Sequence, residues 1–237
     1  MPSNSFTFRK FTIVQDRCAM KVGTDGVLLG AWANGGRDIL DIGTGTGVVA
    51  LMMAQRNNGA NVTAVEIDRE AAIQARENVA ASPFAENIKV VETDIQSFGH
   101  EGKFDAIVSN PPFFTDSLKN PDSQRSTARH TDSLSYRDLF SAVSRLLDDN
   151  GEFSAIIPSD CLTAFTAEAY LSGLAMSRRC AIRTTPRKQA KRYLVAFRHS
   201  HCCRGMETTE QCLMDADGSR SEWYSRLTEN FYISKQE

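Results

Sequence analysis

Asn110-Pro111-Pro112-Phe113 is the stretch of the chain whose residue types are best suited to chemistry on a flat amine. The two prolines have no backbone N–H and fix the chain, which leaves nearby carbonyl oxygens as unpaired acceptors. With the Asn110 side-chain oxygen, such a carbonyl can accept both hydrogens of one amino group and turn its lone pair out of conjugation. Phe113 offers a face on which a planar substrate can stack. The stretch therefore predicts a site that prepares a delocalised nitrogen to attack an electrophile.

A glycine-rich turn, Asp41-Ile42-Gly43-Thr44-Gly45-Thr46-Gly47, follows an apolar run and precedes a helical pattern. Such a turn lets the backbone approach a ligand closely and could serve NAD, FAD or S-adenosylmethionine. The third glycine, Gly47, falls one position earlier than the dinucleotide fingerprint requires, which gives G-x-G-x-G. Asp41 would repel a pyrophosphate but tolerate the ammonium of a methionyl group. The spacing favours S-adenosylmethionine, whose sulfonium methyl is the electrophile that the Asn110 site needs.

Two acidic residues end the next two strand-like runs along the chain. Glu66 closes the second run, where a carboxylate can bind the two hydroxyls of a ribose, and Asp94 closes the third, where an adenine edge would lie. The carboxyl ends of parallel strands meet at one edge of the sheet, so we expect these groups to share a crevice. Each acid taken alone could simply mark the end of a strand. That interpretation does not explain why acids end two successive strands beside the glycine-rich turn.

The elements that must position these residues alternate between strands and helices. We predict strands at 38–43, 62–66, 88–92, 104–109 and 152–158, and a hairpin at the sheet edge from 180–184 and 192–198. We predict helices at 47–57, 69–81, 136–147, 160–171 and near 223–227, with Asn150-Gly151 capping the third. This alternation is typical of an α/β fold with a mostly parallel sheet. Residues 115–135 are predicted to form a loop.

Charge is distributed unevenly along a chain whose formal net charge is −2. Residues 169–206 contain nine Arg and Lys and no Asp or Glu. Clustered cations of this kind are typical of a polyanion-binding surface, although a solvated strand-and-turn surface would also carry them. The side chains that we expect to contact RNA phosphates are Arg129 in the 115–135 loop and Arg187, Lys188, Lys191 and Arg192.

Several classes of protein are disfavoured by the sequence. No stretch is apolar for the ~20 residues of a membrane span, and the first ten residues lack the apolar core of a secretory signal, so we expect a cytoplasmic protein. The cysteines and histidines between His199 and Cys212 lack zinc-site spacing, and we expect no metal. Nothing in the sequence indicates an obligate protein partner.

With these motifs in hand, the chain resembles the class I S-adenosylmethionine-dependent methyltransferases, and within them the bacterial tRNA1(Val) adenine-37 N6-methyltransferases. The resemblance covers nearly the whole chain. Its most specific stretch is FTIVQDRCAMKVGTDGVLLGAW at 11–32, and STARH at 126–130 and EWYSRLTENFY at 222–232 add to it. It implies a Rossmann-like fold with a seven-stranded, mostly parallel sheet, an antiparallel edge hairpin and helices on both faces. It also implies one domain at 37–237 preceded by a cofactor-closing segment at 1–36.

The resemblance assigns roles to matching residues. Its cofactor contacts correspond to Lys21, Gly23, Thr24 and Asp25 near the methionyl end, Asp41, Gly43, Gly45 and Gly47 in the turn, Glu66 at the ribose and Asp94 at the adenine. Asn110 to Phe113 match the amine-binding turn, and a structured tRNA is the implied partner. Phe113 stands where many adenine enzymes have Tyr, as it does in guanine-N2 enzymes of ribosomal RNA. Guanine-N2 and a protein glutamine side chain therefore remain alternative acceptors.

Overall fold

The computed structural model describes residues 4–18, 20–112 and 134–233. The N-terminal half contains β1 (Ser5–Thr7), β2 (Thr12–Val14), α1 (Thr24–Trp32), β3 (Asp38–Ile42), α2 (Val48–Arg56), β4 (Asn61–Glu66), α3 (Arg69–Ala80), β5 (Ile88–Glu92) and β6 (Phe104–Ser109). The C-terminal half contains α4 (Tyr136–Leu146), β7 (Leu147–Pro158), α5 (Leu162–Leu171), β8 (Leu174–Arg183), β9 (Arg192–His199), β10 (Glu207–Cys212) and α6 (Glu222–Thr228).

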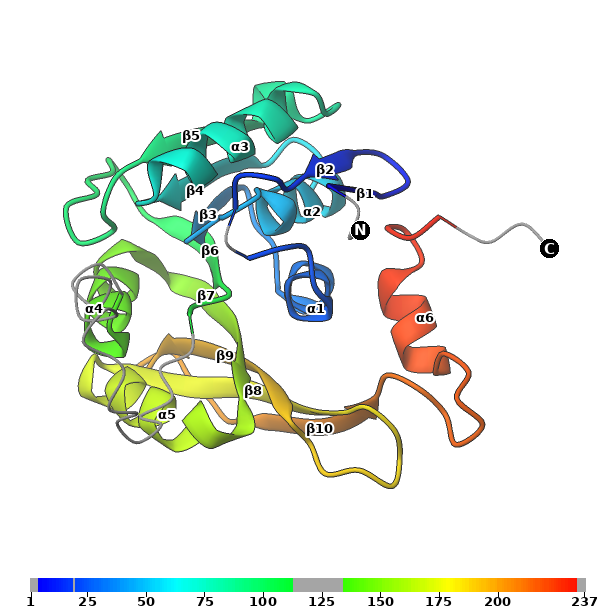
Figure 1. Ribbon diagram of the computed structural model, residues 1–237. Coiled ribbons are helices and arrows are strands. Elements are labelled where there is room, and N and C mark those ends of the chain that lie inside the picture. The colour runs from blue at the N-terminus through cyan, green and yellow to red at the C-terminus, as the bar shows by residue number, and fades with distance from the viewer. Residues whose placement is uncertain (1–3, 19, 113–133, 234–237) are drawn as a thin grey trace, which may run out of the picture.

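One large sheet runs through the molecule in the order β10-β8-β9-β7-β6-β3-β4-β5. Strands β3 to β7 pair with one another in parallel, whereas β9 is antiparallel to both β7 and β8. Strand order reverses between β3 and β6, so the carboxyl ends of the central strands open onto a crevice at the switch point. This is the Rossmann-like arrangement that the resemblance implied, although the sheet has eight strands in the described residues where seven were expected (Figure 1).

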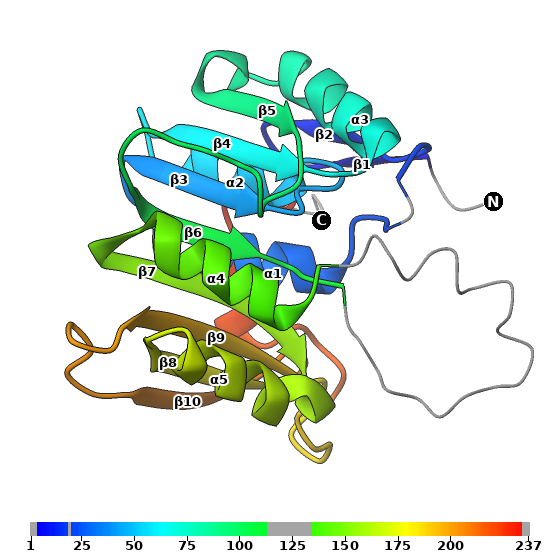
Figure 2. The same cartoon turned by 90° about the vertical axis from the view of Figure 1, so that its left-hand side faces the viewer.

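Helices cover both faces of the sheet, each above its own apolar core. Helices α4 and α5 lie side by side on one face (Figure 2), where Phe140, Phe153, Phe165 and Phe197 pack ring against ring. The other face is covered by α1, α2 and α6, whose apolar side chains form the second core. Within the described residues, no helix is long and apolar enough to cross a membrane.

The C-terminal part of the sheet differs from the prediction. Strands β8 and β9 do form an antiparallel pair, but they are not the edge, because β10 pairs in parallel with β8 outside them. The predicted cap at Asn150-Gly151 is also wrong. Helix α4 ends at Leu146 and β7 begins at once, with a register shift opposite Phe104. A Cβ on Gly151 would lie 2.9 Å from the Phe104 carbonyl oxygen. The glycine therefore allows β6 and β7 to approach each other closely at this point.

The two ends of the described chain pack together. The Arg9 amide donates to the Phe231 carbonyl oxygen over 2.8 Å, and the Phe8 and Tyr232 rings stack with centroids 6.1 Å apart. The Tyr224 and Tyr232 hydroxyls lie 3.0 Å apart, beneath the guanidinium of Arg220. Segment 222–232 thereby supports the N-terminal hairpin of β1 and β2.

Candidate active site

A cavity of about 1110 Å³ lies at the carboxyl ends of β3, β4 and β6, at the strand-order switch point. It brings together sequence-predicted residues from five separate parts of the chain. They are Lys21, Gly23, Thr24, Asp25, Asp41, Gly43, Gly45, Glu66, Asp94, Asn110, Pro111 and Pro112. Two predicted residues, Phe113 and Arg129, lie outside the described residues.

The glycine turn owes its shape to backbone angles that favour glycine. Gly43, Gly45 and Gly47 have φ of +71°, +55° and +83°. A Cβ on Gly43 or Gly45 would meet no atom within 4 Å, so both present bare backbone to open space beside the cavity. Gly47 differs, because its Cβ would lie 3.6 Å from Ala75 of α3, and it is not among the residues that line the cavity. Gly47 therefore lies behind the turn against α3, where its positive φ, and not a lack of space, favours glycine.

Glu66 holds the turn from the end of β4. Its buried carboxylate accepts hydrogen bonds from the Gly45 amide over 2.7 Å and from the Ile67 and Asp68 amides over 3.0 Å each. A carboxylate has about four acceptor positions, so three amides leave room for one further donor. The predicted ribose contact would use that remaining position.

Asp41 is buried beneath the same turn. One of its oxygens accepts from the Thr44 hydroxyl over 2.5 Å and from the Ala50 amide over 3.1 Å. Burial raises the pKa of Asp41 to about 7, against the lowering effect of the Thr44 hydrogen bond. The negative charge of Glu66 raises this pKa further. A cationic ligand beside Asp41 would favour its charged form, because an opposite charge lowers a carboxyl pKa.

The first turn of α1 lines the opposite side of the cavity. Gly23 is the N-cap and supplies no side-chain acceptor, so the first amides of the helix lack a side-chain cap. Such amides, together with the helix dipole, form a favourable site for a carboxylate. Lys21, just before the helix, adds a cation to this wall. The carboxylate of a methionyl group would fit here.

Asn110 follows β6 directly at the cavity wall. Its side-chain oxygen is buried and has no hydrogen-bond partner among the described residues, while its Nδ2 lies 3.8 Å from the Met20 sulfur. The end of β6 is fixed because the Ser109 hydroxyl donates to the Ile42 carbonyl oxygen over 2.9 Å. A buried acceptor without a donor costs roughly 1–3 kcal/mol. This atom is therefore suited to receive an N–H from a ligand.

Asp94 reaches the cavity from the turn that follows β5. Its Oδ1 accepts from the Gln96 amide over 3.0 Å, and the preceding Thr93 amide donates to the Glu66 carbonyl oxygen over 2.9 Å. The turn is thereby held beside Glu66. The two acids lie on the same cavity, as their positions at the strand ends predicted.

Asn78 of α3 supports the site, although sequence reasoning missed it. The residue is buried, and its Nδ2 donates to the Thr46 and Val14 carbonyl oxygens over 2.8 and 2.9 Å. Its Oδ1 accepts from the Val14 amide over 2.9 Å. Asn78 thus joins the glycine turn to β2. A polar residue at a core position of an Ala-rich helix was the available signal.

The segment that leads from β2 to α1 contains further cavity residues that were not predicted. Gln15 fixes this segment, because its side-chain oxygen accepts from the Val22 amide over 2.8 Å. Arg17, Cys18 and Met20 then line the cavity. Burial, followed by the charges of Glu66, Asp68 and Asp16, raises the pKa of Cys18 to about 11, so its thiol is protonated at neutral pH.

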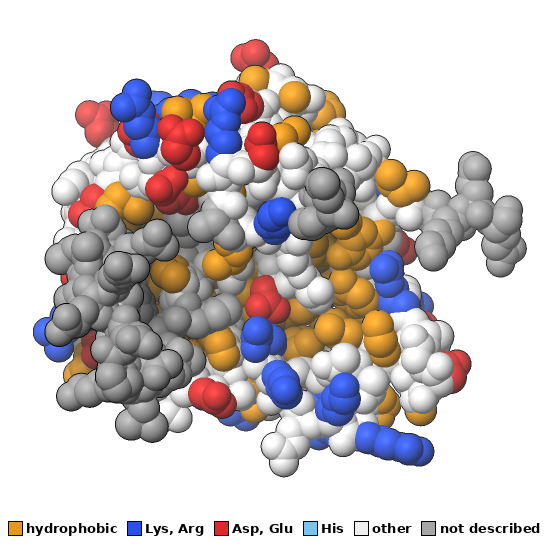
Figure 3. All heavy atoms as spheres, in the orientation of Figure 1, with side chains coloured by type: hydrophobic (Ala, Val, Ile, Leu, Met, Phe, Trp, Pro, Cys, Tyr) orange, Lys and Arg blue, Asp and Glu red, His pale blue; other side chains and the backbone are white. Residues whose placement is uncertain are grey.

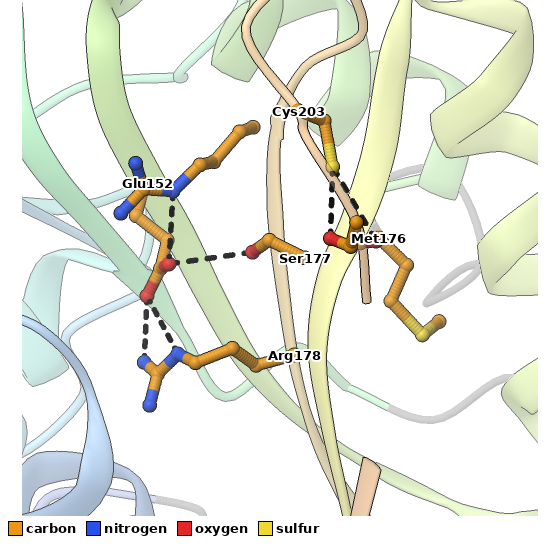
Figure 4. Close-up of polar contacts among 7 residues, drawn as sticks. Glu152, Met176, Ser177, Arg178 and Cys203 are labelled. Atoms are coloured by element: carbon orange, nitrogen blue, oxygen red, sulfur yellow. Dashed lines mark hydrogen bonds and ion pairs between the residues drawn. The ribbon is translucent and has the colours of Figure 1, made fainter. Parts of the chain in front are cut away.

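The basic segment 169–206 is less uniform than its composition suggested. Glu152 accepts from Arg178 over 2.6 Å and from Arg198 over 3.2 Å, and Figure 4 shows its carboxylate turned toward Ser177 and Arg178. The Arg178 guanidinium also lies 3.9 Å from the centre of the Trp32 ring. These two arginines cross-link β7, β8 and β9 from within, so they are unsuited to bind a phosphate chain.

Two further cations of the segment form ion pairs with acids elsewhere in the chain. Arg183 pairs with Glu210 and Arg192 pairs with Asp25, each over 2.8 Å. Among the described residues, Arg187, Lys188 and Lys191 form none of these ion pairs, and they lie in the loop between β8 and β9. Arg179 and Arg204 also form none of these pairs, but three of the five cations without one lie together in residues 187–191, here called the basic loop.

Known proteins share both the sequence and the fold. A family model described as the methyltransferase small domain matches residues 21–161. A Phocaeicola vulgatus protein named tRNA1(Val) (adenine(37)-N6)-methyltransferase is 50% identical and aligns with 99% of this chain and 100% of its own length. A protein of the same name from Pseudoalteromonas translucida is 41% identical, with 97% and 99% covered.

Solved structures agree on the fold. A predicted O-methyltransferase from Agrobacterium tumefaciens has a TM-score of 0.65 at 19% identity, over 87% of this chain and 96% of its own. The glycopeptide N-methyltransferase MtfA, complexed with S-adenosyl-L-methionine, has a TM-score of 0.55 at 13% identity, over 75% and 99%. The likeness confirms the predicted class I methyltransferase fold. The family model and the relatives, which are 41–50% identical over nearly their full length, place the chain in the methyltransferase small domain family, in the group named tRNA1(Val) (adenine(37)-N6)-methyltransferases.

Proposed function

We propose that this chain transfers the methyl group of S-adenosyl-L-methionine to the exocyclic N6 of adenine 37 in tRNA1(Val). The relatives that carry this name align along nearly the whole chain. The observation in the structure that supports the chemistry is the side-chain oxygen of Asn110. It is a buried acceptor for which the described part of the chain provides no donor, at a strand end on the wall of the cavity.

Different cavity residues bind different parts of the cofactor. The uncapped first turn of α1 and Lys21 hold the methionyl carboxylate, and Asp41 faces its ammonium group. Glu66 accepts from the ribose, and Asp94 accepts from the adenine amino group. When bound, the cofactor supplies a methyl group made electrophilic by the adjacent sulfonium. The donor set fits it, because a carboxylate, an ammonium, hydroxyls and an amino group each meet a complementary group.

Asn110 acts on the target base. Its Oδ1 accepts one N–H of the exocyclic amine, and a carbonyl of the Asn110-Pro111-Pro112 turn accepts the other. The amine would then lose conjugation with the ring, so its lone pair would point at the methyl carbon without prior deprotonation. The N–C bond would form as the S–C bond breaks, and the methylated nitrogen would then release its extra proton to solvent. Holding nitrogen, carbon and sulfur in line supplies much of the rate. Phe113, outside the described residues, is assigned the stacking surface for the base.

The rest of the proposal concerns how the tRNA reaches this site. The basic loop binds the phosphate backbone, and the target base is turned out of its stack at a cost of a few kcal/mol. Residues 1–36 form a segment that closes the cofactor site of a single domain at 37–237. We place the reaction in the cytoplasm with its tRNA substrate, and we assign it no obligate protein partner.

The variant Asn110→Ala tests the assignment of the amine site. We expect transfer of tritiated methyl groups to tRNA to fall at least ~100-fold, equivalent to about 2.7 kcal/mol of barrier. Binding of S-adenosylhomocysteine, measured by titration calorimetry, should stay within about twofold. Asn61→Ala is the matched control, because in the described part of the chain the side-chain amide of Asn61 donates one hydrogen bond, to the Asp38 carboxylate at an exposed site. Activity of Asn110→Ala within threefold of the wild type would refute the role.

Nucleoside mass spectrometry of tRNA from a deletion strain identifies the acceptor. Loss of N6-methyladenosine at position 37 of tRNA1(Val) is the expected result. Loss of N2-methylguanosine from ribosomal RNA, or of methylglutamine from a protein, would instead establish one of the alternative acceptors and overturn the adenine assignment.

A further inference from the structure

Asp25 and Arg192 form an ion pair that joins the cofactor cavity to the basic loop. The Arg192 Nε lies 2.8 Å from the Asp25 Oδ2, and the side chains are 37% and 26% exposed. Asp25 is in the first turn of α1 and lines the cavity. Arg192 is the first residue of β9, immediately after the basic loop. This ion pair therefore joins residues that are 167 positions apart in the sequence. One lies on the proposed cofactor cavity and the other lies beside the basic loop, where we propose that tRNA binds.

Arg192 is also tied to the loop it follows. Its Nη1 donates to the Lys191 carbonyl oxygen over 3.0 Å, and the Ser159 amide donates to that same oxygen over 3.1 Å. The Lys191 amide donates to the Ile182 carbonyl oxygen over 3.2 Å. The end of the basic loop is thus fixed to the residue that follows β7, to β8 and, through Arg192, to α1. Figure 3 shows Lys and Arg side chains gathered in the lower part of the molecule, where Figure 1 places this loop.

These contacts assign Arg192 a different task from its neighbours Lys188 and Lys191. Its guanidinium is held by the Asp25 carboxylate and by the Lys191 carbonyl oxygen, and Asp25 lines the cavity at the end proposed for the methionyl group. Both side chains are partly exposed, so a ligand that fixes Asp25 also fixes Arg192, and a phosphate chain on the basic loop does the same from the other side. Side chains already fixed by one ligand cost the second ligand less conformational entropy.

We propose that the Asp25–Arg192 pair makes cofactor binding and tRNA binding cooperative, with Arg192 as a positioning residue. The inference rests on the proposed function. Coupling between two sites is reciprocal, so each ligand tightens the other by the same factor. Because a partly exposed ion pair contributes little free energy, we expect this factor to be small, about threefold.

The test measures tRNA affinity by filter binding, with and without saturating S-adenosylhomocysteine. The wild type should bind tRNA about threefold more tightly with the analogue. In Arg192→Gln, and separately in Asp25→Asn, the ratio should fall to one, and the double variant should lose nothing further. Lys188→Gln is the matched control, because it removes a loop cation outside the pair. It should weaken tRNA binding yet keep the threefold ratio.

Each other outcome decides against the inference. A wild-type ratio of one, or a ratio that Arg192→Gln leaves unchanged, overturns the coupling while tRNA binding and methylation stand. A ratio lost equally in Lys188→Gln shows that loop charge, and not the pair, is responsible. A wild-type protein that neither binds nor methylates tRNA refutes the proposed function, and the inference falls with it.

Discussion

Replacing Asn78 by alanine removes the buried amide that joins the glycine turn to β2. Three hydrogen bonds are lost, two with the Val14 backbone and one with the Thr46 carbonyl oxygen. The Val14 bonds are part-buried and contribute about 1 kcal/mol each, whereas the buried Thr46 oxygen is left without a donor at a cost nearer 2 kcal/mol. Alanine regains about 0.5 kcal/mol as a better helix former. The free energy of unfolding should therefore fall by about 3–4 kcal/mol.

Urea unfolding followed by circular dichroism measures this loss, and Asn87→Ala is the control. The side-chain amide of Asn87 donates one part-buried hydrogen bond, to the Ala60 carbonyl oxygen over 3.3 Å. Removing that side chain should therefore cost no more than about 1 kcal/mol. Only Asn78→Ala should also weaken S-adenosylhomocysteine binding, by about 3- to 10-fold, since Asn78 contacts the glycine turn and Asn87 does not. Equal losses of stability in the two variants, or unchanged ligand affinity in Asn78→Ala, would refute the reasoning.

Two further predictions concern charge. Burial raises the pKa of Asp41 to about 7, above its ordinary value near 3.9, so the stability it contributes is present below about pH 4 and lost as the pH rises to about 7. Asp41→Asn keeps an acceptor for Thr44 and Ala50, so in ligand-free urea unfolding it should gain stability relative to the wild type between pH 5 and pH 8; a pH-independent difference contradicts this. Reversing the charges of Arg187 and Lys188 should weaken tRNA binding and make the slope of log K against log salt shallower by about 1.5. Lys89→Glu, on the exposed side of β5, should change neither, and unchanged binding of the double reversal at low salt would remove the basic loop from the proposal.

The sequence predicted the central strands and helices because their patterns are strong. Helix α3, expected at 69–81, runs from Arg69 to Ala80, and the strands that end near Ile42, Glu66 and Ser109 are where apolar runs placed them. The ends of parallel strands share one edge in any such sheet. The cavity could therefore be predicted to contain Asp41, Glu66 and Asn110 without knowledge of a single distance.

The missed elements lack a pattern that could reveal them. Helix α1 is buried on nearly all sides, so TDGVLLGAW shows no amphipathic alternation, and β1 and β2 have three residues each. Strand β10 is polar and largely exposed, since it is an edge strand. Its sequence, ETTEQC, gives no sign that it adds to the sheet.

Pairings between distant residues were beyond sequence reasoning for another reason. Composition shows that 169–206 is basic, but the acids that neutralise Arg178, Arg183 and Arg192 come from outside that segment. The partners of Asn78 lie 32 and 64 positions away in the sequence. They are backbone atoms, so the types of the partner residues give no indication of these contacts. Such contacts follow only from the tertiary arrangement.

The meeting of segment 222–232 with Phe8 and Arg9 has a consequence for synthesis. During translation the hairpin of β1 and β2 is made before the strands of the main sheet, whereas the carbonyl of Phe231 and the ring of Tyr232 are added after all of those strands. Contacts of such high sequence separation form late, because the whole intervening chain must be closed into a loop. The ring of Phe6 therefore lacks its contact with Tyr232 until the strands of the sheet have been synthesised, and apolar surface exposed in this way favours aggregation of an incomplete chain.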